Sequence, residues 1–131
     1  MRLLIVNYHA RLAGGTETYL QAIFPRLIAA GHTVSILSLD LRETRSEIAP
    51  PQVECLPGAG LDVTQFRQRA QDWQPDLIYL HGLGDPVYEE EIVRHFPTLY
   101  FAHNYGGFCV SGTKTHSFPE ATPCSRTLGV G

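Results

Sequence analysis

A glycine pair followed by an acid has the chemistry of a ligand site. Gly14 and Gly15 precede Thr16 and Glu17. Glycine leaves the backbone N–H groups unshielded, so a phosphate can approach them at the start of a helix and interact with the positive end of its dipole. A tight strand-to-helix turn explains the same glycines without a ligand. Glu17 either complements the helix dipole or accepts hydrogen bonds from a neutral polyol, because a carboxylate repels phosphate.

Three histidines follow predicted strands and form a second group of candidates. His9, His81 and His103 each come at or just beyond the end of such a strand. In an open parallel sheet, ligands bind outside the carboxyl ends of the strands, where the strand order reverses. We therefore expect these three side chains at one edge of the sheet, either lining a crevice or meeting water. His32 and His95 fall at the opposite ends of their elements, and we expect them to be structural.

The elements that position these residues alternate along the chain. Short apolar runs predict strands, and paired apolar residues at helical spacing predict helices. Gly31 can close the first helix, Pro25 predicts a kink in it, and Asp85 with Pro86 predicts the start of the third. The predicted strands cover residues 2–7, 33–39, 53–56, 76–81 and 98–103, and the predicted helices cover 15–30, 62–74 and 85–96.

This alternation predicts an α/β fold: a Rossmann-like open parallel sheet with helices on both faces, as a single domain over residues 1–103. Residues 40–52 combine charged residues with Pro50 and Pro51, which predicts a surface loop. Residues 104–131 contain five glycines and two prolines and show no sustained period. Because so long an irregular stretch is uncommon inside a compact domain, we expect this tail to lead toward a further domain.

Composition excludes several classes of function. The chain has 131 residues, a formal charge of −3 and only ten Lys and Arg residues, which argues against nucleic acid as a partner. No apolar stretch has the length of a spanning helix or of a signal-peptide core, so we expect a cytoplasmic protein. Three cysteines are too few for a secreted disulfide scaffold.

Other chemistries find weaker support. Asp40 follows Gly15 by 25 residues, near the place where a dinucleotide-binding protein keeps an acid for the ribose, but the third glycine of Gly-x-Gly-x-x-Gly is missing. The nearly even spacing of His103, Cys109, His116 and Cys124 differs from the close pairs of a zinc finger, and the two tail cysteines are free, disulfide-linked or metal-bound. No Gly-x-Ser-x-Gly motif indicates a hydrolase.

An ordered set of motifs resembles the N-terminal domain of family 4 glycosyltransferases of the GT-B fold. The set covers nearly the whole chain and consists of Gly14-Gly15-Thr16-Glu17, Gly31-His32-Thr33-Val34, Pro75-Asp76-Leu77-Ile78-Tyr79-Leu80-His81-Gly82 and His103-Asn104-Tyr105. The resemblance implies transfer of a sugar from a nucleotide sugar to a hydroxyl-bearing acceptor, a sugar or a lipid-linked one, with retention and without a metal or other cofactor. It also implies a second Rossmann-like domain that holds the nucleotide, so this chain alone would be inactive.

The resemblance also implies residue roles. The Gly14-Gly15 turn would face the donor diphosphate and stabilise its developing charge. His103 would lie beside the donor sugar as the catalytic residue. The acceptor side would comprise His9, Glu17, His81 and Asn104, although Asn104 stands where many members of the family have Asp. Such an enzyme would work in the cytoplasm, including at the inner face of the membrane. The donor sugar, the acceptor and the oligomeric state stay open, and a homo-oligomer is compatible with the loss of a domain partner.

Overall fold

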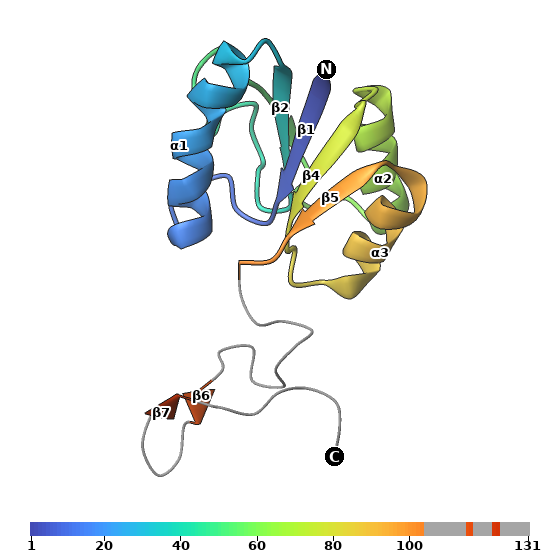
Figure 1. Ribbon diagram of the computed structural model, residues 1–131. Coiled ribbons are helices and arrows are strands. Elements are labelled where there is room, and N and C mark those ends of the chain that lie inside the picture. Colours follow the sequence, from blue (N-terminus) through green and yellow to red (C-terminus); the bar gives the residue numbers. More distant parts are fainter. Residues whose placement is uncertain (104–114, 117–121, 124–131) are drawn as a thin grey trace. The chain divides into compact units, whose positions relative to one another are not determined.

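The computed structural model describes residues 1–103, 115–116 and 122–123 and contains one five-stranded parallel sheet (Figure 1). The order of the strands across the sheet is β3-β2-β1-β4-β5. The strands are β1 (Arg2–Asn7), β2 (Thr33–Ser38), β3 (Glu54–Pro57), β4 (Leu77–His81) and β5 (Thr98–Phe101), and the helices are α1 (Gly15–Ala29), α2 (Val63–Asp72) and α3 (Pro86–His95). The predicted Rossmann-like α/β fold is confirmed.

The three helices cover opposite faces of this sheet. Leu20 and Phe24 of α1 pack in one apolar cluster with one face of β1 and β2. Phe66 of α2 and Ile92 of α3 pack in a second cluster with the other face. Figure 1 shows the same arrangement, with α1 on one side of the strands and α2 and α3 on the other. Because both faces of the central strands are covered, β1 is apolar and buried from Leu3 to Val6.

Residues 40–52 contribute more to the core than a surface loop was expected to. Leu41 and Ile48 are buried and belong to the cluster on the α1 face. The connection from β2 to β3 has no helix, and these two side chains cover the part of the sheet that a crossover helix would cover. The sequence pattern did not show this because Leu41 stands alone between Asp40 and Arg42, and Ile48 follows Glu47 shortly before a proline pair.

The predicted helix signals fit the structure closely. The α1 helix runs through Pro25, and Gly31 follows its end with a φ of 82°, the left-handed conformation that glycine adopts readily. Asp85 accepts a hydrogen bond from the backbone N–H of Val87, and Pro86 is the first residue of α3, as predicted. Element ends differ from the predictions by one or two residues.

The chain divides into two compact units, residues 1–101 and residues 102–131. In the second unit, the two-residue strands β6 (Thr115–His116) and β7 (Thr122–Pro123) pair antiparallel. Asn104, Cys109 and Cys124 lie outside the described residues, so the predictions made for them are not tested.

Candidate functional site

The strand order reverses between β1 and β4, and several candidate residues lie at the carboxyl ends of these two strands. Val6 pairs with Leu80, so Asn7 and His81, one residue further along, end the adjacent strands. The α1 helix begins beyond the end of β1, at Gly15. A reversal of this kind is where open α/β sheets bind their ligands.

The glycine pair at the start of α1 is not required by local packing. A Cβ atom on Gly15 would have no heavy atom within 4 Å in the described part of the chain, and one on Gly14 would meet Glu17 Oε2 at 3.6 Å, an ordinary contact. Gly14 has extended backbone angles, with φ −174° and ψ −158°, which other residues adopt equally well. Both glycines are exposed. Neither conformation nor crowding therefore explains them, which weighs against the tight-turn interpretation.

The first turn of α1 also differs from the other helix N-termini. Within residues 1–103, no side chain caps α1. Asp62 caps α2 in a reciprocal box with Gln65, and Asp85 caps α3. The backbone N–H groups of a first turn have no partner inside their own helix. At α1, no side chain of the described residues takes up this role, and the helix begins beside the reversal of strand order.

Glu17 lies in the first turn of α1 but is buried, with 5% of its surface exposed. Its Oε1 accepts a hydrogen bond of 2.9 Å from Nδ2 of Asn7, which is buried at the end of β1. The same Asn7 amide donates to the carbonyl oxygen of His9 at 2.8 Å. The carboxylate is thus held by β1 behind the exposed glycines, and it stabilises the turn that leads into α1.

His81 ends β4 at the predicted edge but is fully buried. Its ring centroid lies 4.2 Å from that of Tyr79 and 5.9 Å from that of Phe101, and Tyr19 of α1 stacks on Phe101 at 5.5 Å. The hydroxyl groups of Tyr19 and Tyr79 are 2.9 Å apart, and burial raises the pKa of Tyr79. In this arrangement His81 is part of an aromatic cluster and does not line an open crevice.

His9 and Asp40 form a pair at the same edge, beyond β1 and β2. His9 Nδ1 lies 2.7 Å from Asp40 Oδ2, and the His9 side chain is about one third exposed. Asp40 Oδ1 accepts a hydrogen bond from the backbone N–H of Ala10 and lies 3.1 Å from the Ser38 hydroxyl. Arg11 Nε is 3.5 Å from Asp40 Oδ2. Asp40 therefore fixes the orientation of the His9 ring.

Burial and hydrogen bonding act on the pKa of Asp40 in opposite directions. Burial raises the pKa, because it disfavours the charged carboxylate. Hydrogen bonds from His9, the Ala10 N–H and Ser38 outweigh this effect, so the pKa of Asp40 lies below its ordinary value. The group is an anion at neutral pH, and both of its oxygens are engaged within the chain.

His103 is an exposed residue of the second unit and follows β5 in the chain. The structure thus brings Gly14, Gly15 and Glu17 together at the start of α1, and it places His9 and His81 at the ends of the neighbouring strands. His103 is described only within its own unit.

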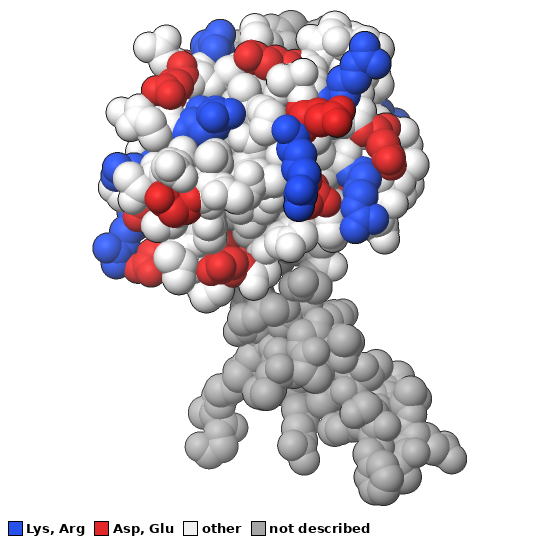
Figure 2. All heavy atoms as spheres, turned by 180° about the vertical axis from the view of Figure 1, so that it is seen from behind, with Lys and Arg blue, Asp and Glu red and all other residues white. Residues whose placement is uncertain are grey.

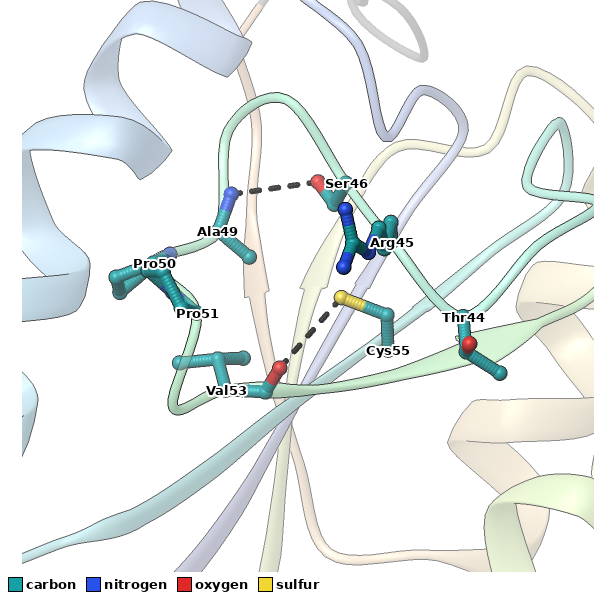
Figure 3. A pocket seen from close by; sticks show the side chains of 8 residues that line it. All are labelled: Thr44, Arg45, Ser46, Ala49, Pro50, Pro51, Val53 and Cys55. Atoms are coloured by element: carbon teal, nitrogen blue, oxygen red, sulfur yellow. Dashed lines mark hydrogen bonds between the residues drawn. The ribbon is translucent and has the colours of Figure 1, made fainter.

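A cavity of about 400 Å³ lies beside β3, under the loop that follows β2 (Figure 3). It was not predicted from the sequence. Its floor is apolar and includes the buried Val53 and Cys55, and the exposed Arg45 reaches over it. Desolvation by burial raises the pKa of the Cys55 thiol, which donates to the Val53 carbonyl oxygen at 3.6 Å. The thiol is therefore neutral at physiological pH and a poor nucleophile.

The surface carries charges of both signs. On the face seen in Figure 2, acidic and basic side chains are interspersed and form no continuous field. Among residues 1–103 and the short strands of the second unit, no group of three or more His, Cys, Asp or Glu side chains is arranged to hold a metal ion. No helix in this part of the chain has the length and apolar character needed to cross a membrane.

Comparisons with protein-family models, with curated proteins and with solved structures found no match. The fold and the edge geometry define the class of protein: a Rossmann-like α/β domain with an uncapped helix at the reversal of its strand order.

Sequence reasoning missed two residues of this site. Asn7 looked like the last residue of a strand, and Tyr19 looked like part of an apolar helix face. A polar residue at the end of a buried strand, followed by a helix with an acidic residue in its first turn, is a usable signal for the Asn7–Glu17 contact. The contact between Tyr19 and Tyr79 has no local sequence signal, because it joins residues 60 positions apart.

Proposed function

We propose that this chain is the acceptor-binding half of a retaining glycosyltransferase, which transfers a sugar from a nucleotide sugar to a hydroxyl group. The observation that carries the proposal is the start of α1. Two exposed glycines there have no packing or conformational requirement, and they leave uncapped N–H groups at the reversal of strand order. Such groups suit a diphosphate, because preorganised donors stabilise the charge that develops as it leaves.

The Glu17 carboxylate is compatible with a phosphate at this place. A carboxylate in the open would repel the anion, but Glu17 is buried and hydrogen-bonded to Asn7. Its role in the proposal is to hold the helix start in place. This differs from the acceptor-side role implied by the family resemblance, and it requires no direct contact between Glu17 and a ligand.

His9 is the strongest acceptor-side candidate of the described residues. It is partly exposed, its Nδ1 is held by Asp40, and it lies at the carboxyl edge of the sheet. An imidazole held through Nδ1 presents Nε2 for a hydrogen bond with a hydroxyl group. His81 can join it only if the cluster around Phe101 rearranges. The reacting centre requires the second domain and His103, a role that comes from the family resemblance.

A dinucleotide-binding domain that uses Asp40 is the alternative. In that reading, the carboxylate accepts hydrogen bonds from a ribose. Both oxygens of Asp40 already interact with His9, Ala10 and Ser38, and Arg11 lies nearby. A ribose would have to displace these partners, which makes this function less favourable than sugar transfer. A binding domain without chemistry is the third possibility, and it predicts no turnover in any assay.

The proposal is tested by assaying sugar transfer in the protein that combines this chain with the proposed second domain. We expect release of the nucleoside diphosphate from a nucleotide sugar to depend on a hydroxyl acceptor, and His103→Ala to abolish it. Turnover unaffected by His103→Ala would remove the catalytic assignment. Failure of every nucleotide sugar, with NAD binding instead, would favour the dinucleotide-binding alternative.

A further inference from the structure

The loop between β2 and β3 encloses a second candidate site, at the β3 edge of the sheet and independent of the proposed sugar transfer. The cavity of about 400 Å³ shown in Figure 3 has a size typical of small-molecule sites. Its lining carries one charged side chain, that of Arg45. The remaining lining residues are Thr44, Ser46, Ala49, Pro50, Pro51, Val53 and Cys55.

The floor and one wall of this cavity are apolar. Val53 and Cys55 are buried, and Ala49 is packed against the core on the α1 face. The neutral Cys55 thiol donates to the Val53 carbonyl oxygen, so it adds no charge. Removing an apolar group of a ligand from water against this floor is favourable.

The Arg45 guanidinium lies over this floor and is available to a ligand. Figure 3 shows the guanidinium among the lining residues, on the same side of β3 as the Cys55 thiol. In the described part of the chain, Arg45 has no hydrogen bond and no ion pair, whereas Arg11, Arg67 and Arg94 each pair with a carboxylate. A guanidinium presents a planar fork of donors that fits a carboxylate or a phosphate with two hydrogen bonds.

The neighbouring polar group Ser46 holds the loop in place and is not available to a ligand. Its hydroxyl donates to the Ala10 carbonyl oxygen at 2.7 Å and accepts from the backbone N–H groups of Ile48 and Ala49. The loop is therefore fixed to the strand-end region at Ala10. The cavity therefore lies between a fixed loop and the buried strand β3.

We propose that this cavity binds a small soluble organic anion that has a carboxylate or phosphate at one end and an apolar body at the other. Arg45 binds the anionic group, and the floor formed by Ala49, Val53 and Cys55 contacts the apolar body. The combination of one guanidinium and an apolar floor favours such a ligand over an inorganic ion, which has no apolar body, and over a neutral apolar molecule, which gains no ion pair with Arg45.

Cys55 is a built-in reporter for this binding. Alkylation of Cys55 in the full chain by a small reagent at alkaline pH, where more of this thiol is ionised, is followed by peptide mass spectrometry, which separates it from the other two cysteines. The probes are phenyl phosphate and benzoate, with inorganic phosphate and benzyl alcohol as comparators. We expect both organic anions to slow alkylation of Cys55 in a saturable way, and the comparators to require at least about tenfold higher concentrations.

Variants of two arginine residues test whether protection of Cys55 depends on Arg45. Arg45→Gln is expected to raise the concentration needed for protection by about tenfold or more, with Arg45→Lys between it and the unchanged protein. Arg42→Gln, on the same loop but outside this cavity, is expected to leave protection unchanged. Circular dichroism of each variant checks that the fold is kept.

The proposal is overturned if neither organic anion protects Cys55, if benzyl alcohol protects equally well, or if Arg45→Gln leaves protection unchanged. A last arm uses phosphatidylcholine vesicles with and without phosphatidic acid. Protection by the acidic vesicles alone would assign the site to a lipid headgroup and overturn its assignment to a soluble ligand.

Discussion

The N-termini of α1 and α2 lie at the same edge of the sheet but are built differently. At α2, Asp62 accepts a hydrogen bond from the Gln65 N–H, and the Gln65 side chain accepts one from the Asp62 N–H. At α1, two exposed glycines take the place of such a cap. The capped start contributes to stability, and the bare one leaves donors accessible. This difference agrees with our proposal that the start of α1 serves ligand binding more than folding.

The largest effect is expected from a side chain added to the bare start. Gly15→Val adds a side chain where the described residues leave open space. The free energy of unfolding of this variant should therefore differ from that of the unchanged protein by no more than about 0.5 kcal/mol. In the proposed enzyme, which combines this chain with a second domain, sugar transfer should fall by about a hundredfold, the loss typical of one preorganised donor. The measurement is kcat/KM alongside a urea titration.

Thr64→Val is the matched control, because Thr64 is an exposed residue in the first turn of α2. It should leave kcat/KM unchanged. Equal losses of transfer in both variants would remove the distinction between the two helix starts.

The second largest effect is expected on stability, from changes to Glu17 in the first turn of α1. Glu17→Ala leaves one of the two N–H groups of the buried Asn7 amide without an acceptor, and we expect a loss of about 1–3 kcal/mol in the free energy of unfolding. Glu17→Gln keeps an oxygen for Asn7 and should lose less. Urea denaturation measures both, and an unchanged stability in Glu17→Ala would show that Asn7 does not depend on this contact.

A smaller effect is expected from exchanging the caps. Asp62→Ala removes the capping box of α2 and should lower the free energy of unfolding by about 1 kcal/mol. Gly14→Ser supplies the capping side chain that α1 lacks and should raise the free energy of unfolding by roughly a few tenths of a kcal/mol. If Gly14→Ser were instead clearly destabilising, the glycine would have a structural role.

The smallest effect is confined to acidic pH and concerns Asp40. Its pKa is lowered in the folded protein, so its contribution to stability is complete above the unfolded value of about 3.9 and is lost as the pH falls through the folded pKa. Asp40→Asn should therefore flatten the loss of stability below about pH 4. Unfolding titrations across this range measure the slope, and an identical slope in both proteins would contradict the assignment.

The sequence was sufficient for the sheet and for most helix boundaries. Buried parallel strands such as Leu3–Val6 are apolar throughout, and caps such as Asp85 act within one turn, so both leave local patterns. The candidate site was harder to predict from the sequence than the fold. The burial of His81 and the contact between Asp40 and His9 both depend on segments that are distant in the sequence. The burial of Ile48 depends on the absence of a helix between β2 and β3, which its own neighbours in the sequence do not show.

The central claim is that the bare start of α1 binds phosphate groups and the capped starts do not. Amide resonances in a ¹⁵N–¹H correlation spectrum test it directly when the chain is titrated with UDP-glucose and, separately, with pyrophosphate. We expect saturable shifts at Gly15, Thr16 and Glu17, with the first-turn amides of α2 and α3 unmoved. Shifts of equal size at all three helix starts, or none at α1 at millimolar ligand, would contradict it.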